Sequence, residues 1–155
     1  MTQGIRQALQ KLDSMIEDAT PKTDSHHNFV SINSRDGSTN LIDSTVANTR
    51  YFDIRTSSIA QDGGLSGLSS NKIGLFEVVV RYDIPYNPQD KLLIMAEDAS
   101  KILNTLKGPD YNLVTTGIIN VVVNNSPTIQ PILDDNGDEL ASLLILPFTL
   151  IYLEA

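Results

Sequence analysis

The chain has 155 residues, a length that suits one domain and suits two domains poorly. Hydrophobic residues make up 41% and charged residues 19%, which are ordinary globular values and exclude a disordered or fibrous chain. The absence of cysteine excludes a disulfide scaffold, a thiol nucleophile and a cysteine-ligated metal. The net charge of −8 has the wrong sign for a surface that binds the phosphates of nucleic acid.

Two segments show the spacing of three and four residues between apolar positions that is typical of an amphipathic helix. The first spans Ile5–Ala19 and ends before Pro21, because proline disfavours helical geometry in the preceding residue. The second spans Asp90–Leu106, with Asn87 as its predicted N-cap and Gly108 at its end. Its predicted apolar stripe consists of Leu92, Met95, Ala96, Ala99, Ile102, Leu103 and Leu106.

Between and after these helices the hydrophobic period changes to two, which predicts half-buried strands. The strongest alternation lies in the segment that begins at Phe76, and the Asn136-Gly137 pair predicts a tight hairpin turn. The predicted strands are 28–33, 49–56, 76–84, 114–124, 128–133 and 140–153. We therefore expect a single α+β domain over residues 1–155, with a mostly antiparallel sheet flanked by two helices and the order αβββαβββ.

Residues 57–74 do not fit this alternation. The eighteen residues include five serines and four glycines, and we expect them to form a long flexible loop. Such a loop is either a surface insertion or a segment that orders against a partner. Its apolar residues Ile59, Leu65, Leu68 and Ile73 favour the partner interpretation.

The segment Leu140–Leu153 is apolar on both faces of its predicted strand. Two amphipathic helices cover one face of a five- or six-stranded sheet and leave the other face bare. Either the sheet folds into a sandwich within the chain, or a neighbouring subunit covers the second face. The segment is too short for a membrane-spanning helix, and Pro147 interrupts it.

No arrangement of residues indicates catalysis or metal binding. His26 and His27 are adjacent before a predicted strand and point to opposite faces, so they are poorly placed to share one metal. The acidic segment 134–139 lacks the ligand spacing of a calcium-binding loop and is interpreted as a hairpin tip. We expect a protein that is not an enzyme and that binds no cofactor.

The layout of the chain resembles the tail terminator (tail completion) proteins of long-tailed bacteriophages. The resemblance rests on the amphipathic helix Ile5–Ala19, the strand Phe76–Tyr82, the helix Asp90–Leu106 and the apolar final strand Phe148–Leu153. It covers most of the chain and rests on the order and pattern of these elements.

The resemblance implies a structural virion protein of the tail or neck, assembled in the host cytoplasm. Six copies would form a ring that caps the tail tube, ends tube polymerisation and presents the surface that joins the head. The implied partners are other copies of the chain, the tail tube protein and a head–neck connector protein. DNA would only pass through the lumen, and no membrane is involved.

For this function we assign six residues to the partner interface: Ile59, Leu65, Leu68, Ile73, Arg50 and Arg55. Two alternatives remain. The chain is another neck, head-completion or tail tube component, or it is a small-molecule-binding α+β domain of a different functional class.

Overall fold

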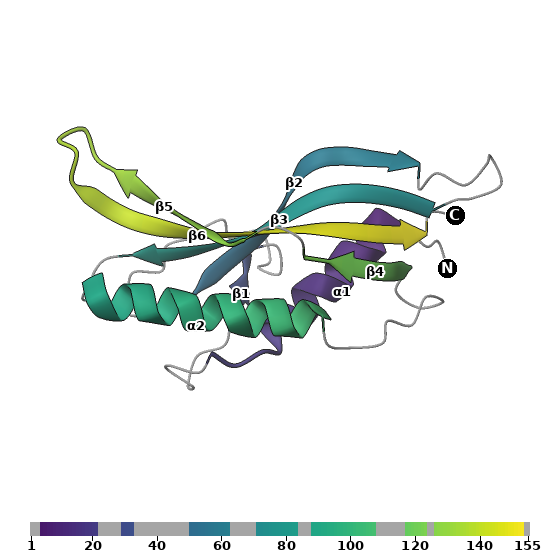
Figure 1. Cartoon of the computed structure of the whole chain (residues 1–155), viewed down its shortest axis with the longest axis horizontal. Coiled ribbons are helices and arrows are strands. Elements are labelled where there is room, and N and C mark those ends of the chain that lie inside the picture. The colour runs from purple at the N-terminus through teal and green to yellow at the C-terminus, as the bar shows by residue number, and fades with distance from the viewer. Residues whose placement is uncertain are drawn as a thin grey trace.

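The computed structural model describes residues 4–21, 29–32, 50–62, 71–83, 88–107, 117–123 and 126–153. In chain order the elements are α1 (Ile5–Glu17), β1 (Val30–Ser31), β2 (Tyr51–Asp62), β3 (Asn71–Asp83), α2 (Pro88–Lys107), β4 (Ile118–Val122), β5 (Thr128–Leu133) and β6 (Glu139–Leu153) (Figure 1). The predicted α+β class, with two helices and a mostly antiparallel sheet, is confirmed, and the predicted order is met in outline. Neither helix in these ranges has the length and apolar character needed to cross a membrane.

All the strands of the described residues belong to one curled sheet with the order β1-β2-β3-β6-β4. Neighbouring strands are antiparallel, except that the short β1 runs parallel to β2. β5 also pairs with β6, on the edge that β4 uses. The sequence allowed two arrangements, a sandwich within the chain or a sheet covered by a neighbouring subunit. The described strands form one sheet and not a sandwich.

Pro147 lies inside the long strand β6, where a proline is unusual because it lacks a backbone donor. On the shared edge of β6, the pairing with β5 ends at Ile145 and the pairing with β4 begins at Thr149. Pro147 falls in the interval between these two partners. The missing donor therefore costs no hydrogen bond on that edge.

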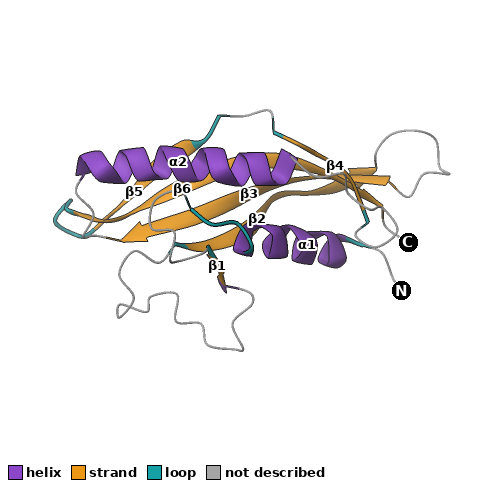
Figure 2. Ribbon diagram, turned by 90° about the horizontal axis from the view of Figure 1, so that it is seen from below, coloured by secondary structure: helices purple, strands orange, loops and turns teal. Residues whose placement is uncertain are grey.

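Both helices pack on the same face of the sheet (Figures 1 and 2). The helix-facing side chains of β3 and β6 are buried with one side of each helix in a single apolar core. At its centre the rings of Phe76 and Phe148 stack with their centroids 5.8 Å apart. The largest apolar contributions from the helices are Leu12, Ile16, Met95, Ile102 and Leu106.

The buried side of α2 is the predicted one at Met95, Ala99, Ile102 and Leu106, but it also includes charged residues that the sequence did not indicate. Leu92 belongs to the predicted apolar stripe but is 56% exposed, whereas Lys91 and Asp98 are buried. Asp98 lies three residues after Met95 and four before Ile102, so it occupies the same side of the helix as these core residues. The helix buries charged residues because partners elsewhere in the fold accept them.

Both ends of the segment 57–74, expected to be a loop, are paired strand. β2 continues to Asp62 and β3 begins at Asn71, so the two strands extend a hairpin whose tip, residues 63–70, lies outside the described residues. The β2–β3 register shifts between Thr56 and Ser58 and again between Ser58 and Gln61. Such irregularities break the two-residue alternation, which explains why the pattern does not indicate a strand here.

Replacing Gly74 with alanine will destabilise the fold. A Cβ atom at position 74 would lie 2.5 Å from Cε2 of Phe76, whose ring is held against Phe148. Overpacking of this kind costs about 1–3 kcal/mol, which chemical denaturation will measure as a lower free energy of unfolding. The comparison variant is Gly4→Ala, where an added Cβ meets no atom within 4 Å and the cost is limited to the N-cap preference of α1, at most about 1 kcal/mol. Equal stability of the two variants would contradict this packing.

Candidate interaction surfaces

The sheet face that points away from the helices carries many apolar side chains, and we call it the open face. Within the described ranges, neither α1 nor α2 lies over it (Figures 1 and 2). Leu75 is 48% exposed, and most of its apolar neighbours on β3 and β6 are half-buried. These half-buried neighbours are Ile73, Leu143, Ile145, Pro147, Ile151 and Leu153.

A hollow of about 120 Å³ lies on the open face beside β2 and the start of β6. Its residues are Ile32, Tyr51, Phe52, Asp53, Arg55, Val79, Arg81, Ile132 and Leu143. The Arg55 side chain is 55% exposed, and its Nε lies 3.7 Å from Oδ2 of Asp53. With Arg81 and Asp53, the hollow combines an apolar floor with two cations and one carboxylate. Glu77 lies directly opposite Arg55 in the β2–β3 pairing and adds a second carboxylate to the same face.

β5, the turn after it and the start of β6 form a projecting hairpin, residues 128–140, which we call the arm. Its outer part, residues 133–140, extends past Asp83, where β3 ends, whereas residues 128–132 lie beside the part of β6 that also pairs with β3 (Figure 1). Leu133 and Leu140 are 55% and 51% exposed, and Ile129 is 47% exposed. The arm therefore presents apolar side chains that the rest of the described chain leaves uncovered.

The turn of the arm is held by its own polar groups. The Asp134 carboxylate accepts hydrogen bonds from the backbone N–H groups of Asn136 and Asp138, each at 2.8 Å. The Asp134 N–H donates to the carbonyl oxygen of Asp138, and Gly137 adopts a φ of 83°. The hairpin predicted from Asn136-Gly137 is confirmed, since this geometry favours glycine.

The base of the arm is tied to the start of α2. The Lys91 ammonium donates to Oε1 of Glu139 at 3.0 Å, and the Ser142 hydroxyl donates to the same oxygen. The hydrogen bond from Ser142 and the charge and hydrogen bond of Lys91 lower the pKa of Glu139 below its ordinary value of 4.5. The carboxylate therefore stays ionised at neutral pH and holds the arm against the helix.

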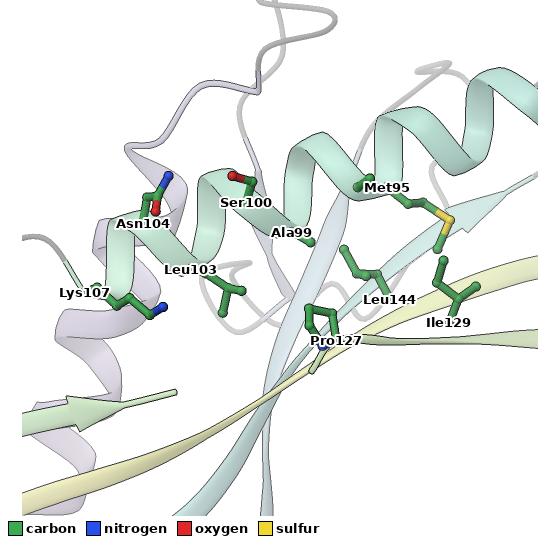
Figure 3. A pocket seen from close by; sticks show the side chains of 10 residues that line it. Met95, Ala99, Ser100, Leu103, Asn104, Lys107, Pro127, Ile129 and Leu144 are labelled. Carbon is green, nitrogen blue, oxygen red and sulfur yellow. The ribbon is translucent and has the colours of Figure 1, made fainter. Parts of the chain in front are cut away.

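A groove of about 510 Å³ runs between α2 and β5 (Figure 3). Its lining comes from Met95, Ala96, Ala99, Ser100, Leu103, Asn104 and Lys107 of α2 and from Pro127, Ile129 and Leu144. Apolar side chains form most of this lining, and the volume lies in the range of small-molecule sites. The groove opens on the helix side of the sheet, away from the open face.

Arg50, Tyr82 and Asp98 form a polar cluster in the interior. Oδ2 of Asp98 accepts hydrogen bonds from Nε of Arg50 and from the Tyr82 hydroxyl, both at 2.6 Å. Burial raises the pKa of Asp98, while the hydrogen bond from Tyr82 and the charge of Arg50 act in the opposite direction. The cluster joins the start of β2 to β3 and α2.

Arg50 was predicted at a partner interface, and the structure corrects this. Its side chain is 1% exposed and pairs with Asp98, so it is not available to a partner of the folded chain. A scattered arginine in a sequence does not reveal its burial. The clue lay in α2, where the spacing places Asp98 on the apolar side and a buried carboxylate needs a cation.

The other predicted interface residues do not lie together in one site. Arg55 is exposed at the hollow and Ile73 is half-buried on β3, both on the open face. Ile59 lies in β2, whereas Leu65 and Leu68 lie outside the described residues.

Sequence reasoning missed Leu133, Leu140 and Arg81 as candidates for a surface contact. One signal was present: residues 108–155 contain six acids and no base, and four of these acids lie in 134–139. The sequence analysis interpreted these acids as a solvated tip. The exposed leucines on both sides of the tip show that this end of the chain is apolar as well as acidic.

Within the described ranges, no three histidine or acidic side chains gather to hold a metal ion. His26 and His27 lie outside those ranges. The comparisons with known proteins add no relative, since no family model and no curated protein sequence matches the chain.

Proposed function

We propose that the chain is a structural subunit of the tail of a long-tailed bacteriophage and acts as the tail terminator. Six copies form a ring that caps the tail tube, ends its polymerisation and joins the tail to the head. The proposal rests on the resemblance of the sequence pattern, and the chain acts by docking, without catalysis.

The observation that carries the proposal is the open face. A contiguous apolar sheet face that no described helix covers favours a protein whose partners complete its burial. Obligate assembly interfaces are more apolar than the rest of a protein surface. A subunit of a permanent ring meets this condition, because its copies stay together after assembly.

The charge of the chain is compatible with a channel for DNA. The net charge is −8, and the last basic residue is Lys107. Where the acidic segments face a lumen, they repel the phosphates of DNA and let it slide without adhering. DNA is therefore a passing neighbour of the ring, and the tube protein and head–neck connector are its binding partners.

The proposed function is tested by an early stop codon in the gene within its phage genome, followed by electron microscopy of the particles. We expect tubes longer than those of the wild type, together with unjoined heads, because nothing caps the tube. A plasmid that supplies the wild-type chain restores normal particles. Tails of normal length joined to heads would contradict the proposal.

A second candidate is small-molecule binding, which the groove between α2 and β5 favours through its volume and apolar lining. A metabolite that occupies the groove raises the melting temperature by mass action. Thermal scans against a metabolite set, with Ala96→Phe at an exposed position of the groove lining, separate this candidate from the ring. A shift seen in the wild type and lost in Ala96→Phe would support it.

A further inference from the structure

We propose that the groove between α2 and β5 binds a long-chain alkyl carboxylate, whose chain lies along the apolar lining and whose carboxylate pairs with Lys107. The inference rests on the second candidate function, small-molecule binding, and names the chemical class of the ligand. It requires neither the ring nor the open face, because the groove lies on the helix side of the sheet.

The floor of the groove is an apolar strip of the sheet. Ile129 of β5 lies directly opposite Leu144 of β6 in the strand pairing, and both residues line the groove together with Pro127. Leu144 is 2% exposed and Ile129 is 47% exposed, so the apolar surface continues from the core outward along β5. An alkyl chain that lies on this strip removes it from water, which supplies the driving force for binding.

The wall of the groove is a row of α2 side chains four residues apart, a spacing that forms a continuous ridge on a helix. In order they are Met95, Ala99, Leu103 and Lys107, and all four line the groove (Figure 3). From the first to the last of them the helix rises about 18 Å. Ala96 and Ala99 end at Cβ and leave space between helix and strand. The row is therefore long enough to accompany a linear chain.

The polar residues of the lining gather at one end. Ser100, Asn104 and Lys107 all lie in the second half of α2, and Lys107 is the single ionisable residue among the described residues that line the groove. Its side chain extends toward Leu103, so the ammonium lies where the apolar row ends (Figure 3). A ligand with an apolar chain and one polar, anionic head therefore matches the lining along its length.

The charges of the chain favour a carboxylate as the head. A net charge of −8 repels anions from the surface as a whole, so an anion is held only where a local cation and apolar burial outweigh that repulsion. Lys107 supplies this cation, and one ammonium balances the single charge of a carboxylate. A cationic head would meet the same ammonium and be repelled.

The ligand class is tested by isothermal titration calorimetry of the purified chain with decanoate below its micelle concentration. We expect saturable binding. Octanoate, which is shorter by two methylene groups, will bind about tenfold more weakly, because it buries less apolar surface. Decanol keeps the chain length but has no charge, and its affinity will be lower than that of decanoate by at least about threefold.

Three variants separate the charge from the apolar lining. Lys107→Gln removes the cation at similar length, so decanoate binds at least about threefold more weakly and decanol binds as before. Ala96→Phe, at an exposed position of the lining, blocks both ligands. The matched control is Lys101→Gln, which makes the same change on an exposed position of α2 outside the groove and leaves both affinities unchanged. Circular dichroism will show whether each variant stays folded.

Nuclear magnetic resonance of the labelled chain locates the ligand independently of the variants. Titration with decanoate is expected to shift the amide signals of Leu103 and Ile129, which line the groove. The signals of Ile73 and Leu75 on the open face are expected to stay in place. Shifts confined to the open face would contradict the assignment of the site.

Three further results would overturn the ligand class: no saturable binding of decanoate, equal effects of Lys107→Gln and Lys101→Gln, or binding of decanoate that survives in Ala96→Phe. A metabolite that stabilises the wild type but not Ala96→Phe, while decanoate does not bind, would overturn the class and uphold small-molecule binding. The terminator function is judged separately, by the tails of the stop-codon phage.

Discussion

Replacing Asp98 with alanine will lower the free energy of unfolding by about 3–5 kcal/mol. The Arg50 side chain is 1% exposed, and its Nε donates to Oδ2 of Asp98 at 2.6 Å. Without the carboxylate, a guanidinium charge stays in the interior, and the Tyr82 hydroxyl also loses its acceptor. Urea denaturation followed by circular dichroism will measure the loss.

The combined variant Arg50→Met/Asp98→Leu replaces both charged residues with apolar ones, so it shows how much the ion pair itself contributes to the stability of the core. Apolar residues of similar volume replace both charges, so the remaining cost is that of the Tyr82 hydroxyl, which loses its acceptor here too, and we expect about 1–3 kcal/mol, less than for Asp98→Ala. That result would show that the carboxylate is required for burying Arg50, while the ion pair as a whole contributes little net stability. If Asp98→Ala costs less than about 1 kcal/mol, Arg50 does not depend on this carboxylate and the interpretation fails.

Phe148→Ala is the second change with a large expected effect, again about 3–5 kcal/mol. Phe148 is 3% exposed and stacks on Phe76 between the sheet and the helices. Truncation leaves a cavity that the rigid sheet cannot close. Thermal unfolding will show a melting temperature lower by roughly 6–20 °C.

The neighbouring residue supplies the control, because successive side chains of a strand point to opposite faces. Thr149 lies half-buried on the open face, and we expect Thr149→Ala to cost less than about 1 kcal/mol in dilute protein. A cost equal to that of Phe148→Ala would contradict the assignment of the two faces. A cost that rises with protein concentration would place position 149 in a contact between copies.

Local patterns predicted the elements whose determinants are close in sequence. The hairpin turn followed from Asn136-Gly137, because positive φ angles suit these residues wherever the turn lies. The helix α1 followed from its spacing of apolar residues and ends at Glu17, a turn before the proline. The strand β6 followed from its long apolar run after the hairpin turn, despite Pro147.

The extended ends of the 57–74 segment did not follow from local pattern. β2 lies on one edge of β3 and β6 lies on the other, so long-range pairing holds the backbone extended through serine-rich residues and two register shifts. Hydrogen bonding to a neighbouring strand needs no side-chain alternation, and the sequence therefore carries little sign of it.

The candidate surface was predicted only in part. Arg55 was expected at a surface contact and lies at the hollow, whereas Arg50 was expected there and lies in the core. The two arginines are five residues apart, and no local feature of the sequence separates them. Their different fates depend on α2, which brings Asp98 to Arg50 and leaves Arg55 at the surface.

The sequence by itself determined the helix and strand types, the turn of the arm and an excess of apolar strand over helical cover, because these depend on periodicity and composition. Only the tertiary structure decided which sheet face stays open and which charges become interior. It also decided that the acidic turn of the arm lies beside exposed leucines and that Arg55 and Arg81 lie at the hollow. These properties depend on contacts between segments far apart in the chain, and no local window of sequence contains both partners.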